Sequence, residues 1–252
     1  MKDPIWLAAS FFFAVLVVAL WQIQADFGWI SRIYLPSPVA TWDALVKGFE
    51  SGVLGMRTLA TIERMIYGWL FASLAGIALG SLIGSSKAAR EYLQPMLEYL
   101  RPMPAAALIP VAIPILGLTE QMVLSVTAFA ALWPTLLGTI HGFASVEERL
   151  VEVTRVLRLS RLAYIFKIAL PNALPDILAG MRLSLTYALI LAVVGEMLTS
   201  REGLGSFILN ASRFYQAPNV FAGAALLGLI GYLTTVLMNL AERRLLRWRV
   251  GN

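Results

Sequence analysis

MIYGWLFASLAGIALGSLIGSS, residues 65–86, contains no charged side chain. A helix of about 20 apolar residues crosses the hydrocarbon core of a bilayer, so this run is long enough to span one. Small residues recur in it at every fourth position, which lets a second helix approach closely in lipid. Such a ridge of small residues is compatible with packing against another helix of the same chain, as a seam, or against a second copy of the chain. Its members are Gly68, Ala72, Gly76, Gly80 and Gly84.

Runs of the same kind recur along the chain. Four more carry no charge, and one is apolar except for Arg182 and Glu196. Only 14% of the residues are charged and 59% are hydrophobic, with a mean hydropathy of +0.75, whereas about a quarter of the residues are charged in a soluble domain. The runs are 4–25, 102–119, 121–146, 177–198 and 214–241.

The pattern predicts an all-α polytopic membrane protein with a single membrane domain over residues 1–252. Six transmembrane helices are expected, with a basic loop at 147–175 between the fourth and fifth. The approximate spans are 5–24, 59–84, 99–118, 121–143, 177–198 and 218–241.

Lys and Arg are distributed unevenly among the segments that join these spans. Counted from the N-terminus, alternate segments hold thirteen of the twenty, the others hold five, and Arg64 and Arg182 lie within spans. Short loops rich in Lys and Arg stay on the cytoplasmic side. We therefore expect both termini in the cytoplasm, and the net charge of +5 requires no nucleic-acid partner.

Few side chains suit catalysis or metal binding. The chain has no cysteine, and its only histidine, His141, lies in an apolar run, where we expect a packed residue rather than a ligand. No span carries paired carboxylates. The sequence therefore argues against a membrane-embedded enzyme and predicts no metal site.

Five residues are candidates for a pathway through the membrane. Pro110 and Pro114 interrupt the third span, and irregular backbone at membrane depth requires cover by protein or by a water-filled cavity. That span is either an internal, broken helix or a kinked one without a transport role. Arg64, Arg182 and Glu196 are ionisable residues within spans; they fit a pathway or side chains that snorkel from helix ends.

VEVTRVLRLSRLAYIFKIALPNALP, residues 151–175, is the basic insert between two spans. Apolar residues follow the i, i+3, i+4, i+7 spacing over 150–157 and again over 162–169, which predicts two short amphipathic helices joined by a bend. Ser160 is the expected N-cap of the second. We expect Pro171 to end that helix and Pro175 to begin the next span.

Such an element has two possible uses. A basic amphipathic helix can lie on anionic lipid. It can equally dock on a cytosolic partner, with the apolar stripe in a groove and the charges fixing its orientation. Physical chemistry alone does not separate these two.

The insert resembles the "EAA" loop of ABC-importer permeases, a coupling helix that docks on an ATPase subunit in that family. Two departures stand out: Val153-Thr154 replace two alanines, and Arg158 replaces a glycine at the bend. A left-handed bend at an arginine would be strained. The matching residues are Glu152, Leu157, Ser160, Ile168, Leu170-Pro171 and Pro175.

Similarity to the nitrate/sulfonate/taurine-type subgroup of these permeases extends over nearly the whole chain. The segments that carry it are Leu35-Pro36-Ser37-Pro38, residues 99–110, Gly180-Met181-Arg182, Gly195-Glu196-Met197, Gly203-Leu204-Gly205 and residues 242–249. The resemblance implies a type I ABC importer permease (MetI-like) fold in the bacterial inner membrane. It also implies a second permease subunit, expected as a homodimer, two cytosolic ATPases and an extracytoplasmic substrate-binding protein.

In this interpretation, ATP-driven motion of the insert tilts the spans that line a midline path, mainly the third, fourth and fifth. The chain has no G-x-x-x-x-G-K-[ST] loop, so ATP and Mg²⁺ would be bound by a partner chain. Arg155, Arg158 and Arg161 are the expected polar docking contacts, and Leu159, Leu162 and Phe166 the expected apolar ones. Glu152, Ser160 and Pro171 complete the expected coupling site.

The alternative is a secondary transporter driven by an ion gradient. It would need an intramembrane proton or sodium site, for which Glu196 is the only acid well inside an apolar run, and no internal inverted repeat is evident. For either transporter the sequence leaves the solute open. The subgroup points to a small anion, which Arg64 and Arg182 would suit, although both also fit helix-end anchors.

Overall fold

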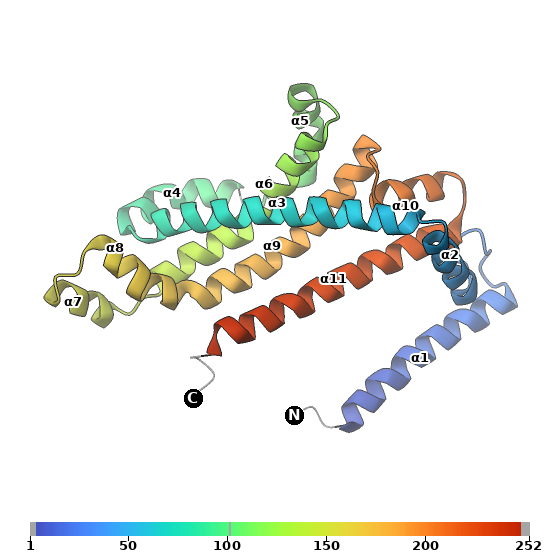
Figure 1. Ribbon diagram of the computed structural model, residues 1–252, viewed down its shortest axis with the longest axis horizontal. Coiled ribbons are helices and arrows are strands. Elements are labelled where there is room, and N and C mark those ends of the chain that lie inside the picture. The colour runs from blue at the N-terminus through green and yellow to red at the C-terminus, as the bar shows by residue number, and fades with distance from the viewer. Residues whose placement is uncertain (1–3, 101, 248–252) are drawn as a thin grey trace. The chain divides into compact units, whose positions relative to one another are not determined.

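The computed structural model describes residues 4–100 and 102–247, and no strand occurs within those ranges (Figure 1). The helices are α1 (Pro4–Phe27), α2 (Pro38–Glu50), α3 (Val53–Gly84), α4 (Lys87–Leu100), the 3₁₀ turn η1 (Ala105–Leu108), α5 (Ile109–Leu116), α6 (Glu120–Ala144), α7 (Glu148–Val156), α8 (Arg161–Tyr164), the π-helical turn η2 (Ile165–Ala169), α9 (Leu170–Thr199), α10 (Leu204–Arg213) and α11 (Ala217–Leu245).

Five helical segments are long and apolar enough to cross a membrane. They are Ala8–Phe27, Val53–Gly84, Glu120–Ala144, Leu162–Thr199 and Ala217–Leu245. The predicted third span, 99–118, is not one helix. Lys87–Leu100 and Ala105–Leu116 meet at a bend of 80° and give a sixth span only if the pair counts as one. Pro102 and Pro104 lie at the bend, where a missing N–H and a fixed φ prevent a helix from continuing.

The chain divides into two compact units, each with more contacts inside it than to the other. Unit 1 comprises Met1–Ala60 and Glu202–Leu229, and unit 2 comprises Thr61–Arg201 and Ile230–Asn252. The single domain over 1–252 remains a prediction.

Unit 1 contains a short helix, α2, in the segment after the first span. Ser37 caps α2 by accepting a hydrogen bond from the Ala40 amide, and Pro38 occupies its first turn. That proline is favourable because the first helical N–H has no intrahelical partner. The indole of Trp21 donates to the Pro36 carbonyl at 2.8 Å and its ring lies 5.7 Å from that of Phe221.

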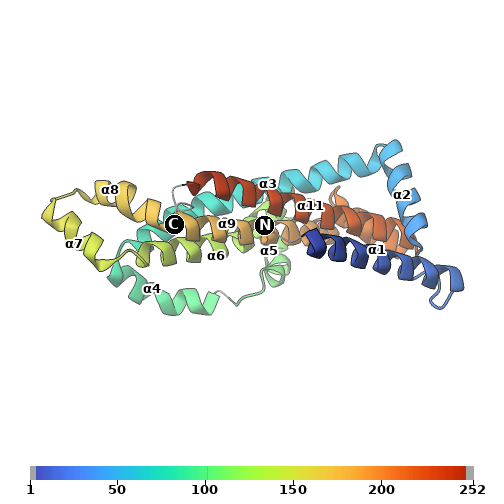
Figure 2. The same ribbon diagram turned by 90° about the horizontal axis from the view of Figure 1, so that it is seen from below.

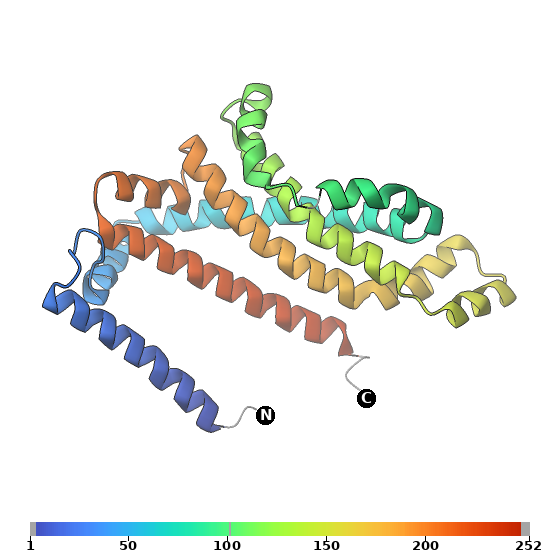
Figure 3. The ribbon, with the colours of Figure 1, turned by 180° about the vertical axis from the view of Figure 1, so that it is seen from behind.

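The centre of unit 2 is the pair α6 and α9, which run side by side (Figures 1 and 3). Glycines allow the close approach: a Cβ on Gly138 would lie 2.6 Å from the Asp176 carbonyl oxygen, and one on Gly180 would lie 2.5 Å from that of Pro134. The hydroxyls of Thr135 and Ser184 are 2.7 Å apart within this interface. Small residues and buried hydroxyl pairs are the means by which helices associate in lipid.

The ridge of small residues on α3 packs against α6. A Cβ on Gly76 would lie 3.0 Å from the Leu136 nitrogen, and one on Gly80 would lie 2.6 Å from Cβ of Thr139. Gly68 and Gly84 face Thr127 and Phe143 of the same helix. Of the two uses that the sequence allowed for this ridge, the structure shows the seam inside one chain.

The segment before α9 differs from the prediction. Pro171 does not end a helix and Pro175 does not begin one: α8, η2 and α9 follow each other without a break from Arg161 to Thr199. Pro171 lies in the first turn of α9, and the amide of Leu170 bonds to the carbonyl of Ile165, five residues back. Because the hydrogen bonds of the π turn span five residues, the helix continues although Pro171 has no N–H to donate.

Candidate functional site

Unit 2 contains a cavity of about 810 Å³. One wall is the Pro102–Ala106 stretch, and the others are α6 and α9. The lining is mainly aliphatic and aromatic, with few polar side chains among it. The side chains with N–H, O–H or carboxylate groups are those of Trp133, His141, Asp176 and Tyr187.

His141 lines this cavity and is exposed, so the prediction of a packed histidine is wrong. Its position follows from the helical period of α6, because Trp133, Leu137 and His141 succeed each other at four-residue spacing on one stripe, and all three line the cavity. That stripe was the signal in the sequence that could have identified them. Asp176 on α9 could be placed only by knowing which helix α9 meets.

None of the five candidate pathway residues lines this cavity. Pro110 and Pro114 lie on α5 and are exposed. Arg182 on α9 forms an ion pair with Glu242 on α11, between side chains that are about one-third exposed. Arg64 and Glu196 pair with each other instead.

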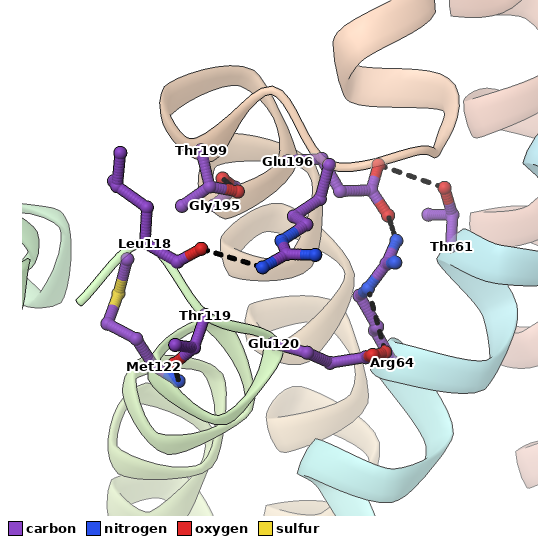
Figure 4. A network of polar contacts seen from close by, with 10 residues as sticks. Thr61, Arg64, Leu118, Thr119, Glu120, Met122, Gly195, Glu196 and Thr199 are labelled. Atoms are coloured by element: carbon purple, nitrogen blue, oxygen red, sulfur yellow. Dashed lines mark hydrogen bonds and ion pairs between the residues drawn. The ribbon is translucent and has the colours of Figure 1, made fainter. Parts of the chain in front are cut away.

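Arg64 and Glu196 are the centre of a polar cluster at the end of unit 2 where α6 begins and α9 ends (Figure 4). The Arg64 Nη1 donates to Glu196 Oε1 at 2.9 Å, and the Thr61 hydroxyl donates to Oε2 at 3.0 Å. Glu196 and Thr61 are 0% exposed and Arg64 is 7% exposed. A buried carboxylate needs such partners on both oxygens, because an uncompensated charge is costly away from water.

Glu120, the first residue of α6, also reaches Arg64, with 3.4 Å between its Oε1 and the Arg64 Nε. The preceding Thr119 caps the helix by accepting a hydrogen bond from the Met122 amide. In the same region Arg201 Nη2 donates to the Leu118 carbonyl at 2.8 Å. Arg64 thus joins α3 to α6 and α9, while Arg201 joins the segments before α6 and after α9.

Of the two short helices predicted in the insert, the first is present as α7, whereas the second, α8 with η2, is the beginning of the long helix that continues as α9. Helices α7 and α8 project beyond α6 within unit 2 (Figure 2). Ser160 is the N-cap as predicted, since its hydroxyl accepts from the Ala163 amide at 3.2 Å. At the bend Arg158 adopts a φ of 48°, the left-handed conformation that glycine would adopt without strain.

The surface of this insert is rich in exposed apolar side chains. Leu162 is 67% exposed and Phe166 is 64% exposed, whereas Leu159 is half-buried. The other predicted coupling residues with described side chains, Glu152, Arg158, Ser160 and Pro171, are exposed. The side chains of Arg155 and Arg161 lie outside the described part of the chain.

Comparison with known proteins identifies the fold and the class. Residues 72–247 match the family model described as "Binding-protein-dependent transport system inner membrane component". The chain is 36% identical, over 93% of its length and 85% of the relative's, to a Bacillus subtilis permease assigned to aliphatic sulfonates transport (SsuC). It is 34% identical, over 87% and 82%, to the nitrate import permease protein NrtB of Synechocystis.

A solved structure shares the fold. The inward-facing MetNI methionine ABC transporter includes a chain that superposes with a TM-score of 0.69, at 18% sequence identity and over 78% of this chain and 97% of that one. The likeness confirms the predicted MetI-like fold.

These findings favour the importer prediction over a transporter driven by an ion gradient. The chain belongs to the family of binding-protein-dependent transport system inner membrane components, the permease subunits of ABC importers.

Proposed function

We propose that the chain forms the membrane path of an importer for a small organic anion of the aliphatic sulfonate type. The observation that carries the proposal is the cavity between the Pro102–Ala106 stretch, α6 and α9, whose wall is mainly aliphatic and aromatic. An apolar wall accommodates an alkyl chain better than a bare inorganic ion, which would lose its hydration without compensation. The similarity to a permease assigned to sulfonates supports the same choice over nitrate.

The polar groups of the cavity suit passage rather than tight binding. Among the lining residues that the structure describes, none is a Lys or an Arg. His141, Trp133 and Tyr187 bear N–H and O–H groups that can donate to anionic oxygens, while Asp176 repels them. A path has to bind a solute weakly enough to release it. Selectivity would then reside mainly with the binding protein.

The importer would contain two copies of this chain, two cytosolic ATPase subunits that bind ATP and Mg²⁺, and an extracytoplasmic binding protein. The ATPase would dock on α7, α8 and η2, with Leu159, Leu162 and Phe166 in a groove and the nearby arginines and Glu152 around it. The exposure of Leu162 and Phe166 supports this role. The excess of Lys and Arg in alternate loops supports an inner-membrane protein with both termini in the cytoplasm.

Deletion of the gene in the organism that encodes it tests the substrate. The deletion strain should fail to grow with ethanesulfonate as the only sulfur source and should grow normally with sulfate. Growth should return when the native gene is supplied on a plasmid. Normal growth on sulfonates, combined with a defect on nitrate as the only nitrogen source, would contradict the proposal.

A further inference from the structure

We propose that the polar cluster around Arg64 is a latch with one permanent arm and one releasable arm, and that transport requires the releasable arm to open. The permanent arm is the Arg64–Glu196 pair. The releasable arm consists of the Glu120–Arg64 and Arg201–Leu118 contacts, which hold the turn of residues 117–120. The proposal rests on the proposed function, because it presumes a path that opens and closes.

The permanent arm is buried and holds both oxygens of the Glu196 carboxylate. Glu196 is 0% exposed, and both of its carboxylate oxygens accept hydrogen bonds from α3, at 2.9 Å from Arg64 and 3.0 Å from Thr61 (Figure 4). Separating α3 from α9 here would remove both α3 donors from the buried Glu196 carboxylate, which is strongly unfavourable. The two helices therefore stay together at this point.

The releasable arm is exposed on the side of the 117–120 turn. The side chain of Glu120 is 58% exposed and lies 3.4 Å from Arg64, and Arg201 and Leu118 are also exposed. The Glu120 carboxylate can exchange Arg64 for water, and salt screens its charge, so this contact costs less to break than one between two buried groups. When the cluster is pulled apart, the contacts to the 117–120 turn therefore break before the contact to Glu196.

The packing below the turn limits which part can move. Met122 and Val123 are buried, and a Cβ on Gly195 of α9 would lie 2.6 Å from the Val123 side chain, so α6 is fixed to α9 from its first full turn onward. Release consequently frees the turn and α5 before it. The α5 face that packs on α6 is apolar and includes Ile109 and Ile113, so its contact with α6 is not tied to one direction. Because η1 connects α5 to the Pro102–Ala106 stretch, this motion moves one wall of the cavity.

Cross-linking tests the latch directly, and the chain has no native cysteine that would interfere. Leu118→Cys with Ser200→Cys places one thiol on each side of the releasable arm and keeps the Leu118 carbonyl and the Arg201 side chain. The double variant is reconstituted with its ATPase and binding protein. Sulfonate uptake is then measured before and after the two thiols react with a short bismaleimide cross-linker that contains a disulfide. Uptake should fall at least tenfold on linking and return on reduction, whereas the two single-cysteine variants should not respond.

A second measurement needs no thiols. Arg201→Ala weakens the releasable arm, so ATP hydrolysis in the absence of binding protein should rise at least twofold, because opening no longer breaks that contact. Arg213→Ala on α10 removes an equal, exposed charge that is not part of the cluster and should leave the rate unchanged. Unchanged uptake after complete linking, or an unchanged or lower rate for Arg201→Ala, would overturn the latch. Sulfonate uptake by the unlinked native chain tests the proposed function independently.

Discussion

The amide of Leu159 donates to the carbonyl of Thr154 at 3.0 Å, five residues back along the chain. Arg158 lies between them with a φ of 48°. This bond with a left-handed residue before its donor is the Schellman arrangement that closes a helix, usually with glycine at the left-handed position. The end of α7 is thus a fixed corner, and it is built on a residue that disfavours the conformation.

The strain at this corner should be measurable. Arg158→Gly removes the steric cost of a left-handed side chain, about 1 kcal/mol, and should slow hydrogen exchange of the α7 amides in the native state. Arg158→Ala is the control, because it removes the same guanidinium but keeps a Cβ. If the two variants exchange at the same rate, the corner stores no strain. Both variants should bind the ATPase less tightly than the native chain, since both lose the predicted docking charge.

Phe166 should be an anchor for the ATPase. Its ring is 64% exposed in the isolated chain, and burying a charge in place of a docked aromatic residue should weaken association by about 2–4 kcal/mol. Phe166→Asp should therefore lose the ATPase on co-purification in detergent, while Phe166→Leu should retain most of it. Undiminished association of Phe166→Asp would exclude this residue from the interface.

The seam between α3 and α6 should not tolerate larger side chains. At Gly80 a Cβ would lie 2.6 Å from Cβ of Thr139 and 2.9 Å from the Leu136 carbonyl oxygen, and a backbone oxygen cannot rotate away. Gly80→Val should lower the free energy of unfolding by about 1–3 kcal/mol. The matched control is Gly228→Ala on α11, where a Cβ would meet no atom within 4 Å. Thermal unfolding in detergent compares the two, and equal midpoints would contradict the packing described here.

The Arg64–Glu196 and Arg182–Glu242 ion pairs should differ in their contribution to stability. Glu196→Gln leaves Arg64 buried beside an uncharged amide and should cost about 3 kcal/mol of unfolding free energy. Glu242→Gln should cost less than about 1 kcal/mol, because both side chains of the Arg182–Glu242 pair are partly exposed. Chemical unfolding in detergent measures both. A larger loss for Glu242→Gln would reverse the order that burial predicts.

Asp176 should slow the passage of an anion. Replacing it by asparagine removes a negative charge from the cavity wall while keeping the size of the side chain, so sulfonate uptake should rise by about twofold or more. Asp43→Asn on α2 removes an equal charge in unit 1 and should have no effect. Slower uptake by Asp176→Asn would show that the solute is not repelled by this carboxylate.

Much of the fold could be predicted from the sequence because its signals are local. A charge-free run such as 65–86 specifies a spanning helix by length alone, and Ser160 specifies a helix start through its own hydroxyl. The corner at Arg158 was located as well, although its left-handed geometry was not. The helix through Pro171 was missed, because a π turn five residues long accommodates the proline in a way that no residue pattern indicates.

The candidate site could be predicted less well. Arg64, Arg182 and Glu196 were recognised as unusual charges within spans, and the structure pairs each of them with another charge away from the cavity. His141 and Asp176 do line the cavity. The four-residue spacing of His141 from Leu137 and Trp133 was a signal for the first, whereas Asp176 could not be placed because a single polar residue on an apolar helix does not reveal which side it faces.

The sequence by itself determined that this chain is a helical membrane protein with a basic two-helix insert, and its motifs indicated the importer family. Those properties depend on hydrophobic length, helical period and capping, which act over a few residues. Only the tertiary structure decided that Arg64 meets Glu196, 132 residues away, that the α3 ridge packs on α6, and that a cavity opens between the Pro102–Ala106 stretch, α6 and α9. In lipid, each spanning helix makes all of its backbone hydrogen bonds within itself. Which helices pack against each other therefore depends on how well their surfaces fit and on the few polar side chains that need a partner on another helix.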